Sequence, residues 1–432
     1  MSFLPSSLRA FAGRRLGPLG PAFQLLLLSD GLMLLSLMVG HVAVPWWVAH
    51  EGGAAQLAIY AAGMAAGSFI ALPLLSPLGD RVSKRRLIAG GLLLMALEAL
   101  VLAALAQLGI YRLAWVMGLE LLAVVAMAAI MPASFSIVAE LLPAERLTEG
   151  LGLQKSAQAL GRLLGPALGG LVLAAASTAV ALWLHAALLL LAAALAARIQ
   201  APTPPAPAQA SHWLADLRAG LVAKWKIPLE RGWTFVSFLV MIFFTPGIGM
   251  LVPLKVQSLG LSAAWLGACE AGLSLGMLLG SLGGSVWLAQ RIGRFNASFA
   301  AILLEGLCMI AIGFSEAPLL IVAGFAMLGA CIATVQMVGQ THRMLAMPQA
   351  FRARMTAVNM MVMQIAGVLG PGLAGGLLLQ GSVGGAYGLF GLGLFLVGLG
   401  YLWVPGYREF LNLPHAQAEG RYAREHPGLF NR

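Results

Sequence analysis

Twelve apolar runs of 19 to 28 residues are distributed along the whole chain and constrain its fold more than any other feature. A helix needs about 20 mainly apolar residues to cross the hydrocarbon core of a bilayer. Each run is therefore predicted to form one transmembrane helix, which gives an all-α polytopic membrane protein. The runs cover residues 23–49, 55–78, 87–107, 112–139, 151–176, 178–198, 232–258, 262–289, 296–314, 317–341, 354–380 and 383–404.

The composition fits lipid better than water as the main solvent. Hydrophobic residues make up 60% of the chain and charged residues 10%, whereas soluble domains carry roughly 25% charge. The net charge of +10 comes from basic residues dispersed between apolar runs, so we expect no nucleic-acid partner. Cys269, Cys308 and Cys331 all lie inside apolar runs, and no disulfide or metal site is expected. No G-x4-G-K-[ST] motif is present, so ATP is not the direct energy source and no cofactor is predicted.

Basic residues indicate the orientation of the chain. Of the 26 lysines and arginines, 22 fall in connections or termini that twelve crossings would put on one side. The positive-inside bias makes that side the cytoplasm, so both termini are predicted to be cytoplasmic, in a bacterial inner membrane. The expected parts are a cytoplasmic N-terminus at 1–22, a six-helix bundle at 23–198, a cytoplasmic linker at 199–231, a second six-helix bundle at 232–404 and a cytoplasmic tail at 405–432.

The linker has two parts of different character. Residues 201–210, APTPPAPAQA, are rich in proline and predict an extended segment. Residues 211–225 follow the period of an amphipathic helix, with Leu221 and Trp225 on the apolar face and Lys224 away from it. We expect this helix to lie on the inner membrane surface. A helix that binds a partner protein is the alternative.

The two halves of the chain repeat one another. Residues 143–166 and 348–371 each begin at a proline and end in Leu-Gly-Pro, and each spans 24 residues. Glu98 and Glu305 occupy matching positions in the third and ninth runs. Two pseudosymmetric six-helix bundles in parallel orientation are typical of secondary transporters, whose substrate sites lie near the membrane midplane between the repeats.

The loop after the second run carries a family resemblance. It reads Ser76-Pro-Leu-Gly-Asp-Arg-Val-Ser-Lys-Arg-Arg and is similar to the G-x-L-A-D-R-x-G-R-K-R loop of the major facilitator superfamily, with serine replacing glycine at Ser76 and Ser83. The resemblance covers essentially the whole chain. In that family the loop latches the two halves on the cytoplasmic side, which assigns Asp80, Arg81 and Arg85 to a latch. A basic loop that serves only topology is the alternative.

The fifth run resembles the helix 5 signature of the family's proton-coupled exporters. The end of the fourth run and the loop after it, MPASFSIVAELLPAERL, resemble those of the exporters of macrolides and siderophores. Small residues four apart let another helix approach closely, so plain helix packing is the alternative interpretation. The chain departs from the family in helix 4, where Glu120 occupies the position of an expected arginine. The signature residues are Gly152, Gly161, Gly165, Pro166, Gly169 and Gly170.

Acidic side chains within the apolar runs are candidates for proton coupling. Each costs about 2.5–3.5 kcal/mol at the bilayer centre, so each is a functional hypothesis. Asp30 in the first run is the first choice, because helix 1 lines the central path in this family. Glu120 is second and Glu270 third, whereas Glu98 and Glu305 are expected to form structural hydrogen bonds.

Three basic residues are candidate cavity charges. Lys155 and Arg162 lie two turns apart on one face of the fifth run, and Arg343 lies near the end of the tenth. They would pair with an intramembrane acid or meet an anionic substrate. The alternative for Lys155 and Arg162 is that both reach the cytoplasmic surface.

The sequence therefore predicts a secondary transporter rather than an enzyme. It would export a small amphipathic organic compound, drug-like or a siderophore, by proton antiport. Lysophospholipid flipping, or import of a nutrient or metal chelate, are the alternatives. The expected partners are the small-molecule substrate, protons and the lipid bilayer, and the protein is expected to be a monomer.

Overall fold

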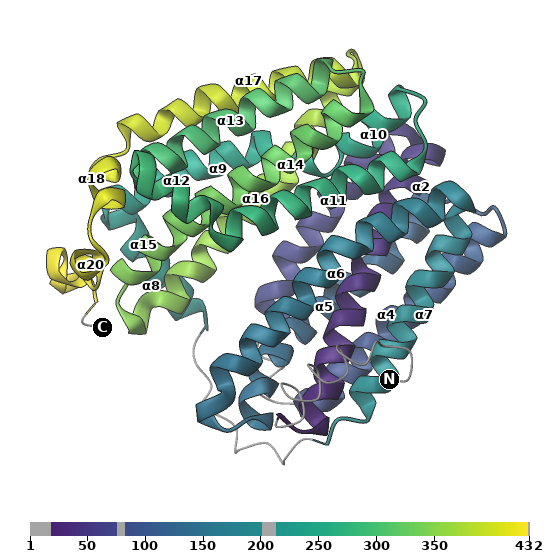
Figure 1. Cartoon of the computed structure of the whole chain (residues 1–432), viewed down its shortest axis with the longest axis horizontal. Helices are drawn as coiled ribbons and strands as arrows, with labels where there is room; N and C mark the ends of the chain where they lie inside the picture. The colour runs from purple at the N-terminus through teal and green to yellow at the C-terminus, as the bar shows by residue number, and fades with distance from the viewer. Residues whose placement is uncertain (1–18, 76–82, 201–212, 431–432) are drawn as a thin grey trace. The chain divides into compact units, whose positions relative to one another are not determined.

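The computed structural model describes residues 19–75, 83–200 and 213–430, and all regular structure in these ranges is helical (Figure 1). Eleven of the described helices are long and apolar enough to cross a membrane. The first, Pro21–Ala71, has 51 residues, about 75 Å of helix, which exceeds twice the ~30 Å hydrocarbon core. Helix α2 (Pro21–Leu75) breaks at Gly53, whose φ of 67° lies in the left-handed region. It therefore makes two crossings, and the twelve predicted spans are accounted for.

The chain divides into two compact units, Met1–Val44 with Ile70–Ala208, and Pro45–Phe69 with Gln209–Arg432. The predicted boundary between the two bundles lies in the linker alone. The structure adds the segment around the Gly53 break to the second unit. Two contacts explain this assignment. Gln257 Nε2 donates to the carbonyl oxygen of Trp46 at 3.4 Å, and Gly375 packs directly against Ala58.

Unit 1 contains the first part of α2 and four further long helices. Helix α4 packs against both α5 and α7, and the core between them holds Met33, Leu92 and Leu189 among other apolar side chains. Ser177 caps α7 by accepting a hydrogen bond from the amide of Val180 at 3.3 Å. The helices are α4 (Lys84–Gln107), α5 (Leu113–Leu141), α6 (Leu147–Ala175) and α7 (Thr178–Ala197).

Unit 2 contains spans that are divided into shorter helices. The predicted run 262–289 is interrupted by a π-helical segment, Gly280–Gly284, in which Gly283 has φ of 135°. A second π-helical segment, Gln336–Gln340, interrupts the run 317–341. Helices α13 and α17 lie side by side (Figure 1). The helices are α9 (Pro228–Ile248), α10 (Leu251–Ser258), α11 (Ala263–Leu279), α12 (Ser285–Ile292), α13 (Arg294–Phe314), α14 (Pro318–Val335), α15 (Thr341–Ala346), α16 (Gln349–Leu378) and α17 (Val383–Leu399).

The linker helix is α8 (Trp213–Lys226), at the position that the amphipathic pattern predicts. Leu221 and Trp225 are exposed, whereas Ala223 and Lys224 are buried against unit 2. A Cβ at Gly220 would lie 2.7 Å from the carbonyl oxygen of Arg354, so α8 packs tightly on α16. The exposed apolar face is available to a membrane surface, and that placement stays a prediction.

The C-terminal tail is folded onto unit 2. It contains three short helices, α18 (Tyr407–Asn412), α19 (His415–Ala418) and α20 (Arg421–Glu425). Tyr407, Phe410 and Tyr422 are each 2% exposed or less, and α19 and α20 contact α15. Burial of three aromatic side chains makes the tail an integral part of this unit.

Candidate functional site

A buried polar link joins three helices of unit 1. Asp30 of α2 is 1% exposed, and Gln154 of α6 is fully buried. The amide Nε2 of Gln154 donates to Oδ2 of Asp30 at 2.5 Å and to the carbonyl oxygen of Ser134 in α5 at 3.1 Å. The Oε1 atom of Gln154 is buried and has no hydrogen-bond partner among the described residues. Asp30, the first-choice acid for proton coupling, thus has a partner, Gln154, that was not predicted.

Two serines hold α2 on the side of α7. Ser29 Oγ donates to the carbonyl oxygen of Ala192 at 2.9 Å. Ser36 Oγ donates to the carbonyl oxygen of His185 at 2.7 Å, and Nδ1 of His185 lies 2.8 Å from the carbonyl oxygen of Ser36. These buried bonds fix α2 between its neighbours, so the Asp30 side chain has a defined direction toward α6.

Three glycines four residues apart bring α6 close to α2. A Cβ at Gly161 would lie 2.8 Å from the Cβ of Leu34, and a Cβ at Gly165 would lie 2.8 Å from the carbonyl oxygen of Leu35. At Gly169 the nearest atom of α2 would be 3.1 Å away. A larger residue would force the helices apart, because such interiors are close-packed.

The other members of the helix 5 signature differ in their surroundings. Pro166 and Gly170 are buried, whereas Gly152 is exposed and a Cβ there would meet nothing within 4 Å. Close packing therefore explains the glycines from Gly161 onward but leaves Gly152 unexplained. The exporter role of the signature stays a prediction.

The second copy makes the matching contact in unit 2. A Cβ at Gly370 of α16 would lie 2.6 Å from the carbonyl oxygen of Ile242 and 2.7 Å from Oγ1 of Thr245, both in α9. In unit 1, α6 (the fifth span) thus packs on the first part of α2 (the first span). In unit 2, α16 (the eleventh span) packs on α9 (the seventh span) in the same way. The repeat seen in the sequence is present in the packing of each unit.

The second acid in our order, Glu120, lies beside Glu98. Glu120 is half-buried in α5, and its charge acts on Glu98 in α4. Both carboxylate oxygens of Glu98 are buried and lack a hydrogen-bond partner among the described residues. The structural hydrogen bond expected for Glu98 is therefore not found, since the charged group next to it is a second acid.

The remaining sequence candidates have other surroundings. Glu270 is half-buried in α11 and interacts electrostatically with Tyr387 of α17. Lys155 and Arg162 are both exposed along α6. The charge of Arg162 acts on His41 of α2. The structure thus groups Asp30 with Gln154, and not with either basic residue of α6.

Arg343 is not an open cavity charge, because it is enclosed in an ion cluster of unit 2. Its Nη2 and Nε lie 2.6 and 2.9 Å from the two carboxylate oxygens of Glu230, which is fully buried. Arg343 also donates to Asn359 at 3.0 Å and Thr234 at 2.9 Å. Its guanidinium lies 4.7 Å from the ring centre of Trp233. Glu230 compensates its charge, which removes Arg343 from the candidates for substrate contact.

Two further residues bind Glu230 from outside the spans. Lys224 Nζ of α8 lies 2.8 Å from Oε2 of Glu230, and the hydroxyl of Tyr422 in α20 donates to Oε1 at 2.8 Å. Burial, together with the charge of Arg343, lowers the pKa of Lys224 to about 8, although Glu230 opposes that shift. Burial raises the pKa of Tyr422 well above its usual value, so its hydroxyl stays a donor. One carboxylate therefore joins the linker helix, α9, α15 and the tail.

No direct sequence signal pointed to this cluster. Glu230 lies within the predicted linker, Lys224 was expected away from the apolar face of the linker helix, and Tyr422 was not singled out. Pro228 at the start of α9, followed by Glu230 in its first turn, is the pattern of a helix start. It identifies the helix end but not the partners.

The predicted latch lies largely outside the described residues. Asp80 and Arg81 belong to the range 76–82, and Arg85 is exposed at the start of α4. Nearby, Lys84 Nζ forms an ion pair with Oε1 of Glu140 at the end of α5, at 2.5 Å. This pair was not predicted, and the latch itself stays a prediction.

The fold and the repeated helix packing define a polytopic membrane transporter. Residues 26–304, more than half of the chain, match the family model of the Major Facilitator Superfamily. The chain belongs to this superfamily, and it is a transporter rather than an enzyme.

Several known proteins resemble the chain over most of its length. The Multidrug efflux pump Tap of Mycobacterium tuberculosis is 27% identical over 418 residues, which cover 93% of this chain and 97% of the pump. Tap of Mycolicibacterium fortuitum is 26% identical over 253 residues, 58% of this chain and 61% of that pump.

Two solved structures show the same fold. A mutant of the peptide transporter POT with alafosfalin has a TM-score of 0.67 at 15% identity and covers 90% of this chain and 95% of that chain. A bacterial homologue of the human lysosomal transporter Spinster, in an inward-facing and occupied conformation, has a TM-score of 0.63 at 13% identity and covers 92% and 97%.

Proposed function

We propose that this transporter exports small amphipathic organic compounds, drug-like molecules or siderophores, in exchange for protons. Asp30 would accept a proton from outside the cell and release it inside, alternating with the cargo. The protein would act as a monomer in the bacterial inner membrane, with both termini and the tail in the cytoplasm. The count of basic residues in the connections supports this orientation.

The contact between Asp30 and Gln154 carries the proposal. An ionised Asp30 can only accept hydrogen bonds, and Nε2 of Gln154 supplies one at 2.5 Å. A protonated Asp30 can donate, and the unpartnered Oε1 of Gln154 is an acceptor on the same side chain. One pair of residues can thus stabilise both protonation states through a small change in geometry.

The position of the pair supports coupling between the proton and helix movement. Gln154 lies in α6 about two to four turns before the glycines that contact α2. Because α6 also bonds to α5 through Gln154, a change at Asp30 would be transmitted to two helices. Coupling of a proton to helix movement needs a structural element that can take two discrete arrangements, and the Asp30–Gln154 pair would be that element.

The named relatives support the direction and the cargo class. Tap is a multidrug efflux pump, and the 27% identity extends over 93% of this chain. The helix 5 signature supports the same direction. Many aromatic and methionine residues, 18 Phe, 10 Trp and 20 Met, permit an aromatic cargo, because such side chains adapt to varied apolar ligands.

Reconstitution into liposomes tests the proposal. Purified protein in vesicles with an acidic lumen should concentrate ethidium or a fluorescent macrolide inside, driven by proton exit. A protonophore should abolish the accumulation. Accumulation of the same size with no pH gradient would contradict proton antiport. Failure to carry either ethidium or the macrolide, in either direction, would contradict the cargo class.

A further inference from the structure

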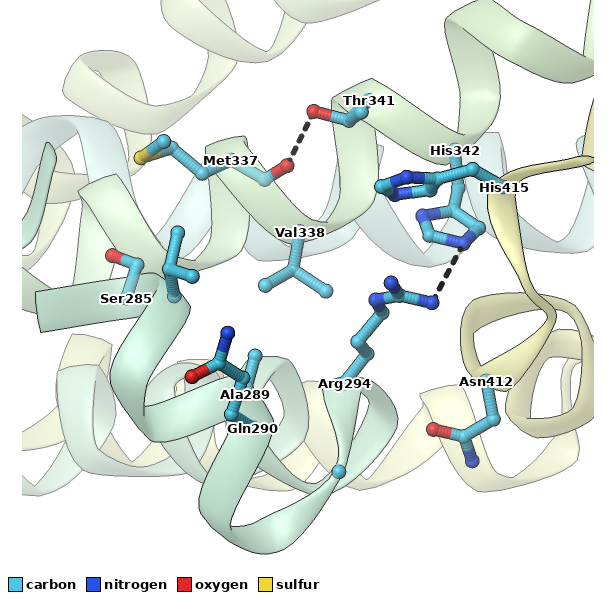
Figure 2. Close-up of a pocket in the computed structure, with 12 residues that line it drawn as sticks. Ser285, Ala289, Gln290, Arg294, Met337, Val338, Thr341, His342, Asn412 and His415 are labelled. Atoms are coloured by element: carbon cyan, nitrogen blue, oxygen red, sulfur yellow. Dashed lines mark hydrogen bonds between the residues drawn. The ribbon is translucent and has the colours of Figure 1, made fainter. Parts of the chain in front are cut away.

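A cavity of about 500 Å³ lies within unit 2, and its lining includes none of the residues of the Glu230 cluster. It is formed by α12, the start of α13, the junction of the Gln336–Gln340 segment with α15, and the tail helices α18 and α19 (Figure 2). A volume of this size is in the range of small-ligand sites, roughly 300–1,000 Å³. The transport proposal does not use this cavity.

One end of the cavity is cationic and polar. Arg294, His342 and His415 converge there (Figure 2). Arg294 Nη1 donates to the carbonyl oxygen of Leu413 at 2.8 Å, and the two imidazole rings lie 5.0 Å apart. No carboxylate belongs to the lining, and within the described ranges Arg294 has no ion-pair partner. This end is therefore complementary to an anion.

The other end is apolar and lies along the spans. Val286 and Met337 line it and are 47% and 38% exposed, and Ala289 and Val338 complete it. Both neighbouring spans contain a π-helical segment here: Gly280–Gly284 directly precedes α12, and Gln336–Gln340 itself supplies Met337 and Val338 to the lining. Such π-helical breaks are frequent at functional sites.

Two side chains of a type common at membrane interfaces lie on α12, which lines the cavity. Trp287 of α12 is 59% exposed, and the guanidinium of Arg291 lies 5.6 Å from its ring centre. Exposed Trp with Arg at the end of a span is the usual interfacial anchor. A ligand in the cavity can therefore have its polar part toward the tail and its apolar part in the lipid.

We propose that this cavity binds an anionic phospholipid, with the headgroup phosphate on Arg294 and His415 and the start of one acyl chain along Val286 and Met337. Gln290 and Asn412, also in the lining, can bind the headgroup hydroxyls. In the proposed orientation this lipid comes from the cytoplasmic leaflet, where anionic lipids attract basic side chains. Because α18 and α19 form one wall, the lipid also holds the tail against the bundle. The proposal does not depend on proton coupling.

Native mass spectrometry of the full-length protein in detergent tests this site. Phosphatidylglycerol, phosphatidylethanolamine with the same acyl chains, and glycerol 3-phosphate are compared as ligands. We expect one phosphatidylglycerol adduct, at least about tenfold tighter than phosphatidylethanolamine, since charge-assisted hydrogen bonds are the strong ones. Glycerol 3-phosphate should not compete at equal concentration, because it lacks the acyl chains.

Variants identify the position of the adduct. Arg294→Gln and His415→Ala should each weaken it about tenfold or more, and Ala289→Phe should block it by filling the apolar end. Arg291→Gln is the matched control, as it removes a neighbouring arginine that does not line the cavity. The melting temperature of each variant checks folding. Because His415 is exposed, His415→Ala should fold normally, and it still tests the site if Arg294→Gln unfolds.

Three results would overturn the proposal. Equal binding of the two lipids would remove the anionic preference. Equal binding by the native chain and by all three cavity variants would put the lipid elsewhere. Competition by glycerol 3-phosphate at the lipid's own concentration would make the cavity a site for a soluble phosphate ester instead of a lipid.

Discussion

Gln154 donates a 2.5 Å hydrogen bond to the carboxylate of Asp30, and both side chains are buried inside unit 1. This contact connects α6, the helix with the exporter signature, to α2. It also determines what a substitution at either residue should do.

Replacing Gln154 with leucine removes one of the donors to Asp30, the other being Gln158, and leaves a buried carboxylate without this partner. A buried polar group that loses its partner costs about 1–3 kcal/mol. We expect a lower melting temperature and a transport rate at least about tenfold below native, if the loss is realised in the rate-limiting step. Ser156→Ala is the control, because Ser156 is exposed on the same helix and bonds only to Gly152. Native transport by Gln154→Leu would show that the contact is incidental.

The glycines of α6 should differ sharply in their tolerance of a methyl group. Gly165→Ala pushes a Cβ into α2, and overpacking of this kind costs about 1–3 kcal/mol. Gly152→Ala meets open space, and it should stabilise by up to about 1 kcal/mol through helix propensity. Melting temperatures of the two purified variants measure the difference. If both variants melt alike, α6 and α2 are not packed as described.

Glu230→Gln should be among the most destabilising single changes in unit 2. It leaves Arg343 and Lys224 buried without their counter-ion, and removing one partner of a buried pair costs about 3–5 kcal/mol. Glu140→Gln is the control, since its pair with Lys84 is nearly one-fifth exposed and such pairs contribute about 1 kcal/mol or less. Equal melting temperatures for the two variants would contradict the role of the Glu230 cluster.

Lys224 should make stability depend on pH above neutrality. Its pKa is about 8 in the folded protein, against 10.5 for an ordinary lysine. Between these values the unfolded chain binds more protons than the folded chain, so the contribution of Lys224 to stability rises as the pH rises. The melting temperature of native protein minus that of Lys224→Met should therefore be larger at pH 9.5 than at pH 7.5. Lys226→Met, which removes an exposed lysine of the same helix, controls for net charge, and a difference that does not change with pH would refute the assignment.

Hydropathy predicted the architecture well. The spans follow from apolar length alone, because lipid leaves no other way to satisfy the backbone of an isolated segment. What it missed are the interruptions in unit 2. The π-helical segments at Gly280–Gly284 and Gln336–Gln340 depend on how neighbouring helices pack. The spacing of apolar residues along the sequence does not predict that packing.

The candidate site was predicted only in part. Asp30 was selected as an acid in an apolar run, in the helix that lines the central path of the resembled family, and the glycines from Gly152 to Gly170 by their resemblance to the exporter signature. Gln154 lies inside the same signature but was not among the residues selected from it. Glu230, Lys224 and Tyr422 come from the start of α9, the linker helix and the tail. The contacts of Glu230 with Arg343 and Tyr422 are long-range tertiary contacts, which a single sequence does not encode in any local pattern.

The most direct test of the account is the effect of Asp30→Asn on accumulation driven by a pH gradient. The asparagine keeps the size of the side chain and removes its ability to exchange a proton. We predict that vesicles with the variant still exchange labelled cargo for unlabelled cargo but no longer concentrate it when the lumen is acidic. Glu270→Gln is measured beside it as an acid from the other unit. Concentration of cargo by Asp30→Asn to the native level would contradict Asp30 as the proton carrier.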